Sequence, residues 1–204
     1  MKRKVTKNHC ISFLVLTNAT SYAALVYNIF VLIYIDDHLL YIGGWAYKKE
    51  YKTYFSSVEF MSINNNSTCH IQSLDYELGY HASAVTPIGV ITCGGRISKG
   101  RGRKECVRLT DKNTWKSFPS MNEARESFDL VVVGDFLVAF EPHEYTFEKI
   151  NWRNGSQWEL PIWKFNRAFY GSCVTKWDDE NVLITGGRKL KSNVSNRYIN
   201  LTIY

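Results

Sequence analysis

The sequence lacks the short motifs that most often reveal an enzyme or a metal site. It contains no Cys-x-x-Cys pair, no His-Glu-x-x-His and no Gly-x-Ser-x-Gly, which argues against a structural zinc site, a zinc peptidase and an α/β-hydrolase. The stretch from Gly100 to Gly102 lacks the strand, loop and helix of a phosphate-binding loop. The sequence therefore predicts a protein without catalytic activity, metal or cofactor.

Cysteine is scarce, and its spacing is irregular. The five residues are Cys10, Cys69, Cys93, Cys106 and Cys173. An odd number leaves at least one thiol unpaired within the chain, and the spacing does not indicate a dense disulfide framework. We expect reduced, half-buried cysteines on strands.

Charge is absent between residues 11 and 35, and a basic stretch at residues 2–7 precedes this run. This order is typical of a signal peptide or signal anchor. However, polar residues divide the run into two apolar parts, 11–16 and 22–35, and each is short for a membrane span. We favour two buried strands, Ala23–Val26 and Phe30–Ile35. Residues 1–21 form a separate segment that is either a targeting segment or a first strand.

The remaining composition is that of one folded, strand-rich domain. The chain has 204 residues, of which 45% are hydrophobic, 22% charged and 15% aromatic, and aromatic residues favour strands. The net charge is +6, and one basic cluster runs from Arg96 to Arg108. Such a cluster predicts a solvated loop or a contact for an acidic protein partner. We do not expect nucleic-acid binding.

Three Gly-Gly pairs each follow a turn and a short apolar strand: Gly43-Gly44, Gly94-Gly95 and Gly186-Gly187. A fourth copy in the same register has Phe140-Glu141 in place of the glycines, and the first positions of the four pairs lie 46 to 51 residues apart. This period fits a four-stranded propeller blade and not a shorter solenoid repeat. Because Phe and Glu lack the dihedral freedom of glycine, we expect a distorted blade at the fourth copy.

A second landmark keeps phase with the first. Trp115 and Trp158 precede the next pair position by 25 and 28 residues, and each is followed by a Pro and then by an Arg, at Arg125 and Arg167. Two features that recur in phase indicate one repeat rather than chance similarity.

The order of turn, strand, Gly-Gly and later Trp, Pro and Arg resembles the kelch repeat. The resemblance covers about residues 22–204 and implies an all-β, kelch-type β-propeller of about four four-stranded blades, in an incomplete or unusually small ring. It also implies that the Trp packs between blades and that Arg125 and Arg167 lie near the next blade's inner strand. An open ring would leave strand edges at which the chain can self-associate.

The resemblance implies protein binding rather than chemistry. Many cytoplasmic kelch domains are substrate receptors of cullin-based ubiquitin ligases, and others bind the cytoskeletal protein actin, although this chain contains neither a BTB nor a BACK domain. We therefore predict a cytoplasmic, non-enzymatic adaptor. A copper-dependent oxidase-like propeller is a remote alternative, for which the sequence offers no set of Tyr, Cys and His on one face.

A secreted or membrane-anchored adhesion propeller is the nearer alternative, and a membrane contact is expected only if the N-terminus is a signal anchor. Six Asn-x-Ser/Thr tripeptides accompany the apolar N-terminus. Their acceptors are Asn18, Asn65, Asn66, Asn154, Asn193 and Asn200.

Loops at the ends of blades gather on one face of a propeller, where Arg, Tyr and Trp side chains can hold a partner. The candidate partner-binding residues come from the basic cluster and from the segment after the first Gly-Gly pair. They are Arg96, Arg101, Arg103, Arg108, Trp45 and Tyr47.

Overall fold

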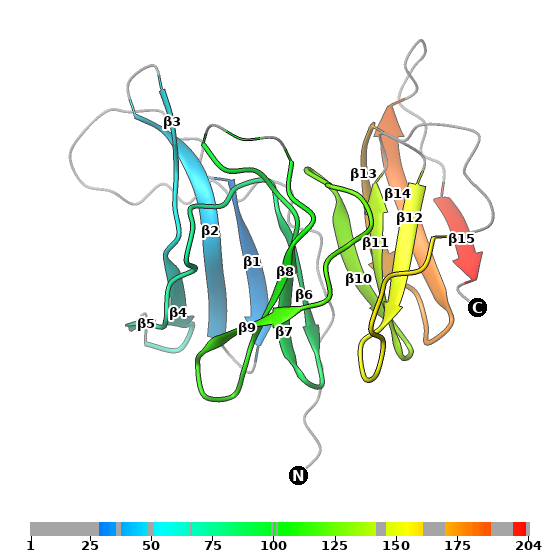
Figure 1. Cartoon of the computed structure of the whole chain (residues 1–204), viewed down its shortest axis with the longest axis horizontal. Coiled ribbons are helices and arrows are strands. Elements are labelled where there is room, and N and C mark those ends of the chain that lie inside the picture. Colours follow the sequence, from blue (N-terminus) through cyan, green and yellow to red (C-terminus); the bar gives the residue numbers. More distant parts are fainter. Residues whose placement is uncertain are drawn as a thin grey trace.

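The computed structural model describes residues 29–35, 38–48, 51–65, 67–98, 100, 102–141, 146–160, 170–188 and 198–202. In these ranges every regular element is a β-strand, and the strands form antiparallel sheets (Figure 1). None of the described residues belongs to a helix with the length and hydropathy needed to cross a membrane. The predicted all-β class is confirmed. The predicted strand Ala23–Val26 lies outside the described residues.

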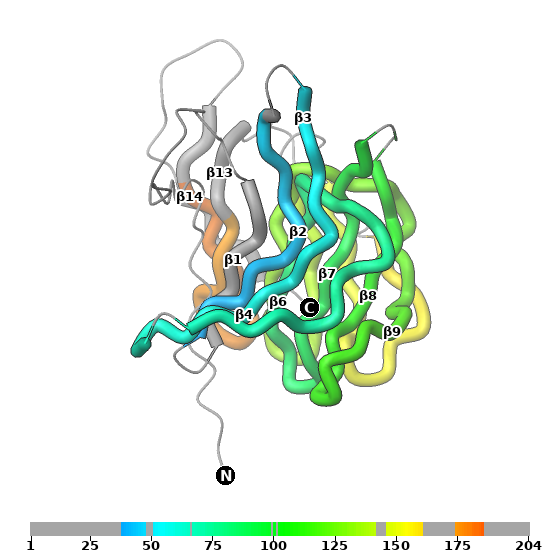
Figure 2. Tube along the Cα trace, turned by 90° about the vertical axis from the view of Figure 1, so that its left-hand side faces the viewer, coloured from blue at the N-terminus to red at the C-terminus, as the bar shows by residue number. Residues whose placement is uncertain are grey.

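The described strands form four sheets that follow one another along the chain. The first has the order β1-β2-β4-β5, with β3 also paired to β2. Its strands are β1 (Ile29–Ile35), β2 (His38–Lys48), β3 (Tyr51–Tyr54), β4 (Val58–Ser62) and β5 (Thr68–His70). Figure 2 views the molecule from the side of this sheet. The predicted strand Phe30–Ile35 is confirmed as part of β1.

In each of the other three sheets, every strand pairs with the strand that follows it in the sequence. The second contains β6 (Ala82–Thr86), β7 (Gly89–Cys93), β8 (Cys106–Leu109) and β9 (Trp115–Phe118). The third contains β10 (Asp129–Val133), β11 (Phe136–Glu141) and β12 (Thr146–Asn151). The fourth contains β13 (Tyr170–Lys176), β14 (Asn181–Arg188) and β15 (Tyr198–Thr202).

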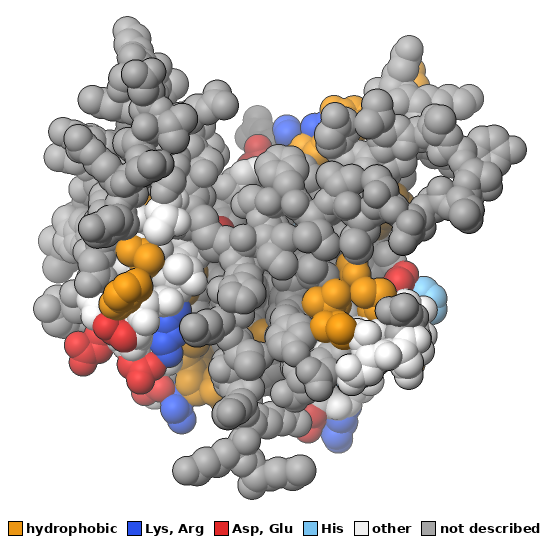
Figure 3. All heavy atoms as spheres, turned by 180° about the vertical axis from the view of Figure 1, so that it is seen from behind, with side chains coloured by type: hydrophobic (Ala, Val, Ile, Leu, Met, Phe, Trp, Pro, Cys, Tyr) orange, Lys and Arg blue, Asp and Glu red, His pale blue; other side chains and the backbone are white. Residues whose placement is uncertain are grey.

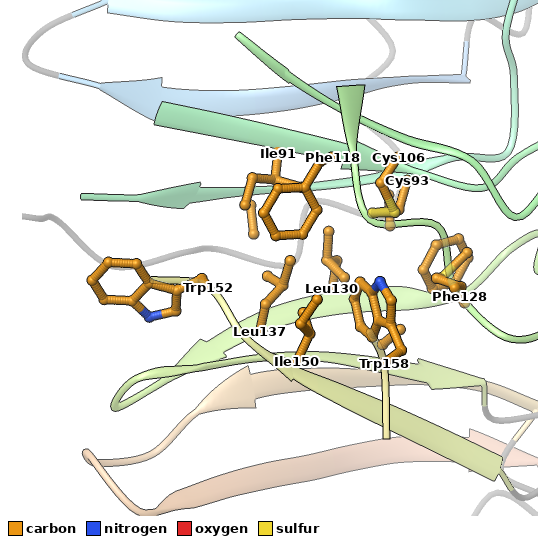
Figure 4. Packing of buried hydrophobic residues seen from close by; sticks show 14 residues of the cluster. Ile91, Cys93, Cys106, Phe118, Phe128, Leu130, Leu137, Ile150, Trp152 and Trp158 are labelled. Atoms are coloured by element: carbon orange, nitrogen blue, oxygen red, sulfur yellow. A yellow bond between two sulfur atoms is a disulfide. The ribbon is translucent and has the colours of Figure 1, made fainter. Parts of the chain in front are cut away.

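Consecutive sheets pack against each other through separate hydrophobic cores. Leu40 and Ile42 of the first sheet meet Val90 and Leu109 of the second. Ile91 and Phe118 of the second meet Leu137, Ile150 and Trp158 of the third segment (Figure 4), and further apolar side chains of β10 to β12 meet β13 and β14. The first strands β1, β6, β10 and β13 contact one another in that order. The sheets are therefore stacked in chain order with their first strands side by side.

The first two sheets share one hydrogen-bond pattern around their Gly-Gly pairs. The amide of Gly44 donates to the carbonyl of Leu78 at 2.7 Å, and the amide of Gly95 donates to that of Arg125, also at 2.7 Å. Four further backbone bonds of the first sheet have a counterpart in the second. In the first sheet the amides of Gly43, Phe55, Leu74 and Leu78 donate to the carbonyls of Ser57, Gly44, Ser56 and Phe55, respectively. In the second sheet the amides of Gly94, Arg103, Met121 and Arg125 donate to the carbonyls of Glu105, Gly95, Lys104 and Arg103, in the same order. The two sheets are therefore copies of one structural unit.

The glycine pairs serve both dihedral freedom and close approach. Both residues of each pair have positive φ, 53° and 104° at Gly43 and Gly44, and 64° and 87° at Gly94 and Gly95. A Cβ on Gly43 would lie 2.6 Å from the carbonyl oxygen of Leu78, and one on Gly94 would lie 2.7 Å from that of Arg125. A side chain at either position would therefore push the next linker away.

The expected distortion at Phe140-Glu141 is wrong as far as strand pairing is concerned. Strand β11 stays in regular register with both neighbours, and Phe140 pairs with Asp129 on one side and Phe147 on the other. The chain continues the hairpin here instead of bending, so no positive φ is needed. Phe140 is buried in the core shared with the fourth sheet, which accommodates its bulk.

The two repeat tryptophans make matching contacts with the preceding unit. The indole Nε1 of Trp115 donates to the carbonyl of Gln72 at 2.7 Å, and that of Trp158 donates to the carbonyl of Pro119 at 2.8 Å. Trp158 is buried, and Trp115 is half-buried against the core between the first two sheets. The two tryptophans thus pack between consecutive units.

Arg125 links the second sheet to the third through a buried charge network. Its side chain is fully buried, and its Nε lies 2.9 Å from Oε1 of Glu148, which is also fully buried. Its Nη1 contacts Glu141 at 3.0 Å and donates to the hydroxyl of Thr146 at 2.8 Å. The second carboxylate oxygen of Glu148 accepts from the amide of Asn122 at 2.7 Å. Both buried charges are therefore paired and hydrogen-bonded.

The expectation of reduced cysteines is wrong for two of the five. Cys93 and Cys106 are direct cross-strand partners on β7 and β8 and form a disulfide inside the core (Figure 4). Their Cα atoms are 4.1 Å apart, a separation that arises when two cysteines fall at opposite positions of an antiparallel ladder. Sequence spacing could not show this pairing, because it depends on strand register. Cys69 is free and exposed.

We predict that Arg125→Met lowers the unfolding free energy by about 3 to 5 kcal/mol, because it leaves the Glu148 carboxylate buried without a counter-charge. The measurement is equilibrium urea unfolding. Arg153→Ala is the control, since it removes an exposed ion pair with Asp135 and should cost about 1 kcal/mol or less. Equal costs for the two variants would contradict the network's role.

Two buried groups have pKa values shifted in opposite senses. Burial raises the pKa of Asp129 to about 6, although its Oδ2 accepts a hydrogen bond from the amide of Val174 that partly offsets the shift. Burial lowers the pKa of His81 to about 4, with a smaller opposing effect from the backbone of Ile42. The fold therefore favours a neutral Asp129 and a neutral His81.

These shifts oppose each other as pH changes. The contribution of a neutral Asp129 to the unfolding free energy is complete below pH 4 and is lost as pH rises through about 6. The contribution of a neutral His81 is complete above pH 6.5 and is lost as pH falls toward 4. Each term amounts to roughly 3 kcal/mol at most. In the native chain the two terms largely cancel between pH 4 and 6.5.

We predict that two variants separate them. Asp129→Asn, which keeps a neutral acceptor for the Val174 amide, should lose stability as pH falls from 6.5 to 4. His81→Phe, which copies the buried Phe128 of the next repeat, should gain stability over the same range. The measurement is the unfolding free energy of both variants as a function of pH. All other titrating groups are the same in the two variants, so the difference between their curves reports on Asp129 and His81. Parallel curves would contradict this assignment.

Candidate functional site

Strands β2 and β14 end at the top of Figure 1, where β3 also begins. In the first two sheets, the Gly-Gly pairs and the linkers that follow them are hydrogen-bonded to each other. Side chains of β2, β3 and these linkers therefore meet in this part of the molecule.

An aromatic cluster occupies this end of the first sheet. The rings of Trp45 and Tyr80 are stacked, with centroids 5.4 Å apart and planes at 29°. Tyr47 meets Trp45 edge-on, at 5.3 Å and 86°, and Tyr54 lies 6.4 Å from Tyr80. Trp45 and Tyr54 are buried, whereas Tyr47 is 37% exposed. The cluster thus has a buried base and an accessible side.

Lys52 places its ammonium group among three of these rings. Its Nζ lies 4.4 Å from the ring centroid of Trp45, 5.3 Å from that of Tyr80 and 5.9 Å from that of Tyr47. It also donates a hydrogen bond to the Oη of Tyr80 at 2.7 Å, and this bond is the main cause that raises the pKa of Lys52. The cation is therefore held by ring faces and by one phenol.

The backbone that carries Tyr80 is fixed by the repeat. Tyr80 has a φ of 58°, which is unusual for a bulky residue, and Ser127 has a φ of 57° at the same position of the next copy. Gly79 precedes Tyr80, and a Cβ there would lie 2.9 Å from the rings of both Trp45 and Tyr54. The linker therefore approaches β2 and β3 closely enough to place the Tyr80 ring on Trp45.

An ion pair lies beside the cluster. Arg96 exchanges backbone hydrogen bonds with Gly79, and its Nε lies 3.6 Å from Oε2 of Glu126. Burial is the main cause that raises the pKa of Tyr54, with smaller opposing effects from Lys52 and Arg96 and a further rise from Glu126. The aromatic cluster and the ion pair thus share one patch of surface.

The structure brings together only some of the residues nominated from sequence. Trp45 and Tyr47 are in contact, and Arg96 lies next to them across Gly79. Arg103 instead packs over the ring of Tyr76, 4.0 Å from its centroid, and pairs with Glu105.

The assignment of Arg108 to a loop is wrong, because Arg108 lies within β8 and pairs with Ile91 and Lys116. Arg101 and Arg167 lie outside the described residues. Gly186 and Gly187 lie within β14, where Gly186 pairs with Ser172 of β13.

Sequence reasoning missed Lys52, Tyr54 and Tyr80. A usable signal was present for Tyr80, which lies 47 residues before Ser127 in the linker that follows each unit. Lys52 and Tyr54 carry no motif, because their place depends on how the strand β3 folds back along β2. Within the described ranges, no group of three or more His, Cys, Asp and Glu side chains is placed to hold a metal ion.

Comparison with known proteins gives a fold and no family. No protein-family model matches the chain, and no curated protein matches it. A solved structure, that of YjhT, is similar over 85% of this chain and 80% of its own, with a TM-score of 0.60 and 10% sequence identity. The likeness shows that the two chains share a fold, and it carries no information about activity.

Proposed function

We propose that this chain is a non-enzymatic protein-interaction module built on a kelch-type propeller of about four blades. The aromatic cluster of Trp45, Tyr47, Tyr54 and Tyr80, with Lys52, is the centre of its binding face. The main support is the cluster itself, in which large aromatic rings are fixed by the backbone and remain partly accessible. Tyr and Trp are the residue types that most often dominate the energetics of protein interfaces.

The distribution of other exposed hydrophobic side chains also favours this end. On the reverse face (Figure 3), the described hydrophobic side chains gather in small separate groups with charged side chains beside them. Elsewhere, Trp177 is 64% exposed and has no ring contact with another described residue of the kind that fixes Tyr47. Single exposed hydrophobic residues are ordinary on protein surfaces, whereas a fixed cluster is not.

For a chain located in the cytoplasm, the specific role that we propose is that of a substrate adaptor for a cullin-based ubiquitin ligase. In that role the binding face would hold the substrate, and the ligase would be reached through another protein, because none of the described residues forms a helix. Stacked sheets with repeated hydrogen bonds support the propeller on which this role depends.

We predict that a specific partner is lost when the cluster is altered. Tyr47→Ala and Tyr80→Ser should each reduce capture of the partner by about tenfold or more, and Ser127 shows that Ser is compatible with the backbone at position 80. Tyr51→Ala is the matched control, since Tyr51 is 76% exposed on the same hairpin. The measurement is quantitative mass spectrometry of proteins crosslinked to each tagged chain in cells.

A partner is a protein retained by the native chain and by Tyr51→Ala and lost from both cluster variants. Circular dichroism confirms that the variants are folded. If every captured protein is retained equally by all four chains, the cluster is not the binding face.

A secreted or membrane-anchored recognition module is the second candidate, favoured by the disulfide between Cys93 and Cys106. Structural disulfides persist mainly in oxidising compartments. Asn65 and Asn154, acceptors of two of the tripeptides, are exposed in turns at residues 63–65 and 152–154. In secretory-competent cells this candidate predicts that removal of N-glycans shifts the chain on a gel, and that Asn65→Gln with Asn154→Gln reduces the shift. An unshifted chain with free thiols at both cysteines would eliminate it.

A further inference from the structure

We propose that Trp45, Tyr47 and Tyr80 form a box for a cationic side chain of the protein partner, and that Lys52 fills this box in the free chain as a competing internal ligand. The inference rests on the proposed function, because it assigns the chemistry that the same face recognises. The partner group would be a lysine, a methylated lysine or an arginine.

The three residues meet at one point, which Tyr80 approaches with its hydroxyl group rather than with its ring face. Tyr47 stands at 86° to Trp45, while Tyr80 is nearly parallel to Trp45 at 29°. All three ring centroids lie within 6 Å of the same nitrogen, at 4.4, 5.3 and 5.9 Å from Nζ of Lys52. Ring faces carry negative partial charge, so Trp45 and Tyr47 attract a cation at this point, and Oη of Tyr80 accepts a hydrogen bond from it. Aromatic boxes of this kind recognise ammonium groups.

The internal ligand is suited to displacement. Lys52 belongs to the short strand β3 and its side chain is exposed, so it can leave the box without exposing a buried charge. Exposed cation–π contacts are weak, and an ammonium group regains full hydration when it moves into water. The hydrogen bond from Lys52 to Tyr80 is the one direct polar bond it loses among the described contacts.

The residues of the box are more firmly held than the exposed Lys52 side chain that occupies it. Tyr80 is held by the repeat backbone, and Trp45 is buried.

The net charge of +6 does not prevent a cation from binding here. Charges beyond about 8 Å are largely screened at physiological ionic strength, while the ring faces act at contact. An incoming cation competes mainly with Lys52, because the nearby Arg96 is paired with Glu126.

The test uses tetramethylammonium as the probe and the whole chain in 0.15 M salt. The signal is the ¹H–¹⁵N resonance of the Trp45 indole, assigned by its absence from Trp45→Phe. We expect a saturable shift in Lys52→Ala at a concentration several-fold lower than in the native chain, because the competitor is gone. Tyr47→Ala in the Lys52→Ala background should weaken this binding several-fold, and Tyr51→Ala in that background should leave it unchanged.

Two results would each reject the cation box. A folded Lys52→Ala chain that shows no saturable shift would mean that the rings serve only to hold the β2–β3 hairpin, and the box would be rejected. The same holds if Lys52→Ala loses the cellular partner rather than binding it more tightly, because Lys52 would then contact an acidic group of that partner.

The failure of this inference can be separated from failure of the proposed function. If Tyr47→Ala abolishes partner capture while Lys52→Ala binds no tetramethylammonium, the face binds a partner by other chemistry. If the box binds the probe while Tyr47→Ala retains every captured protein, the box exists and the proposed binding face is wrong.

Discussion

The hydrogen bond from the second glycine of a pair to the carbonyl of the following linker is the constraint on which the described architecture depends. Gly44 donates to Leu78, and Gly95 donates to Arg125, at the same distance of 2.7 Å. Each bond ties the second strand of one sheet to the segment that leads into the next sheet. Because a Cβ on Gly43 or Gly94 would strike these carbonyls, the bond and the glycine pair require each other.

This constraint also positions the candidate site. Leu78 is bonded to Gly44, and the next residues are Gly79, which lies against Trp45 and Tyr54, and Tyr80, whose ring stacks on Trp45. The aromatic cluster is therefore a direct consequence of how one unit is joined to the next. In the second copy the matching position is Ser127, which keeps the backbone conformation without a ring. The same scaffold thus carries an aromatic cluster at one junction and a serine at another.

The sequence predicted most of what local geometry and repetition control. Paired glycines and tryptophans in phase indicated an all-β repeat, and the structure confirms the all-β class. In the structure Gly43-Gly44 and Gly94-Gly95 have positive φ, and Trp115 and Trp158 donate hydrogen bonds to the preceding unit. The sequence did not predict features that depend on register across strands. The disulfide of Cys93 with Cys106 and the approach of Lys52 to Trp45 arise from residues that become opposite only after pairing. The expected distortion at Phe140-Glu141 was wrong because the strand pairs onward and buries the Phe.

Amide hydrogen exchange at Gly44 and Gly95 in the intact chain tests this account most directly, because each amide donates the bond that joins two sheets. The account predicts that both amides exchange as slowly as those in the cores of β2 and β7, since they open only when the junction opens. Rapid exchange at Gly44 and Gly95, with slow exchange in those strands, would contradict it. The junction would then depend on its other contacts, such as the paired backbone bonds of Gly79 with Arg96, and the glycine bond would not be the constraint that positions Tyr80.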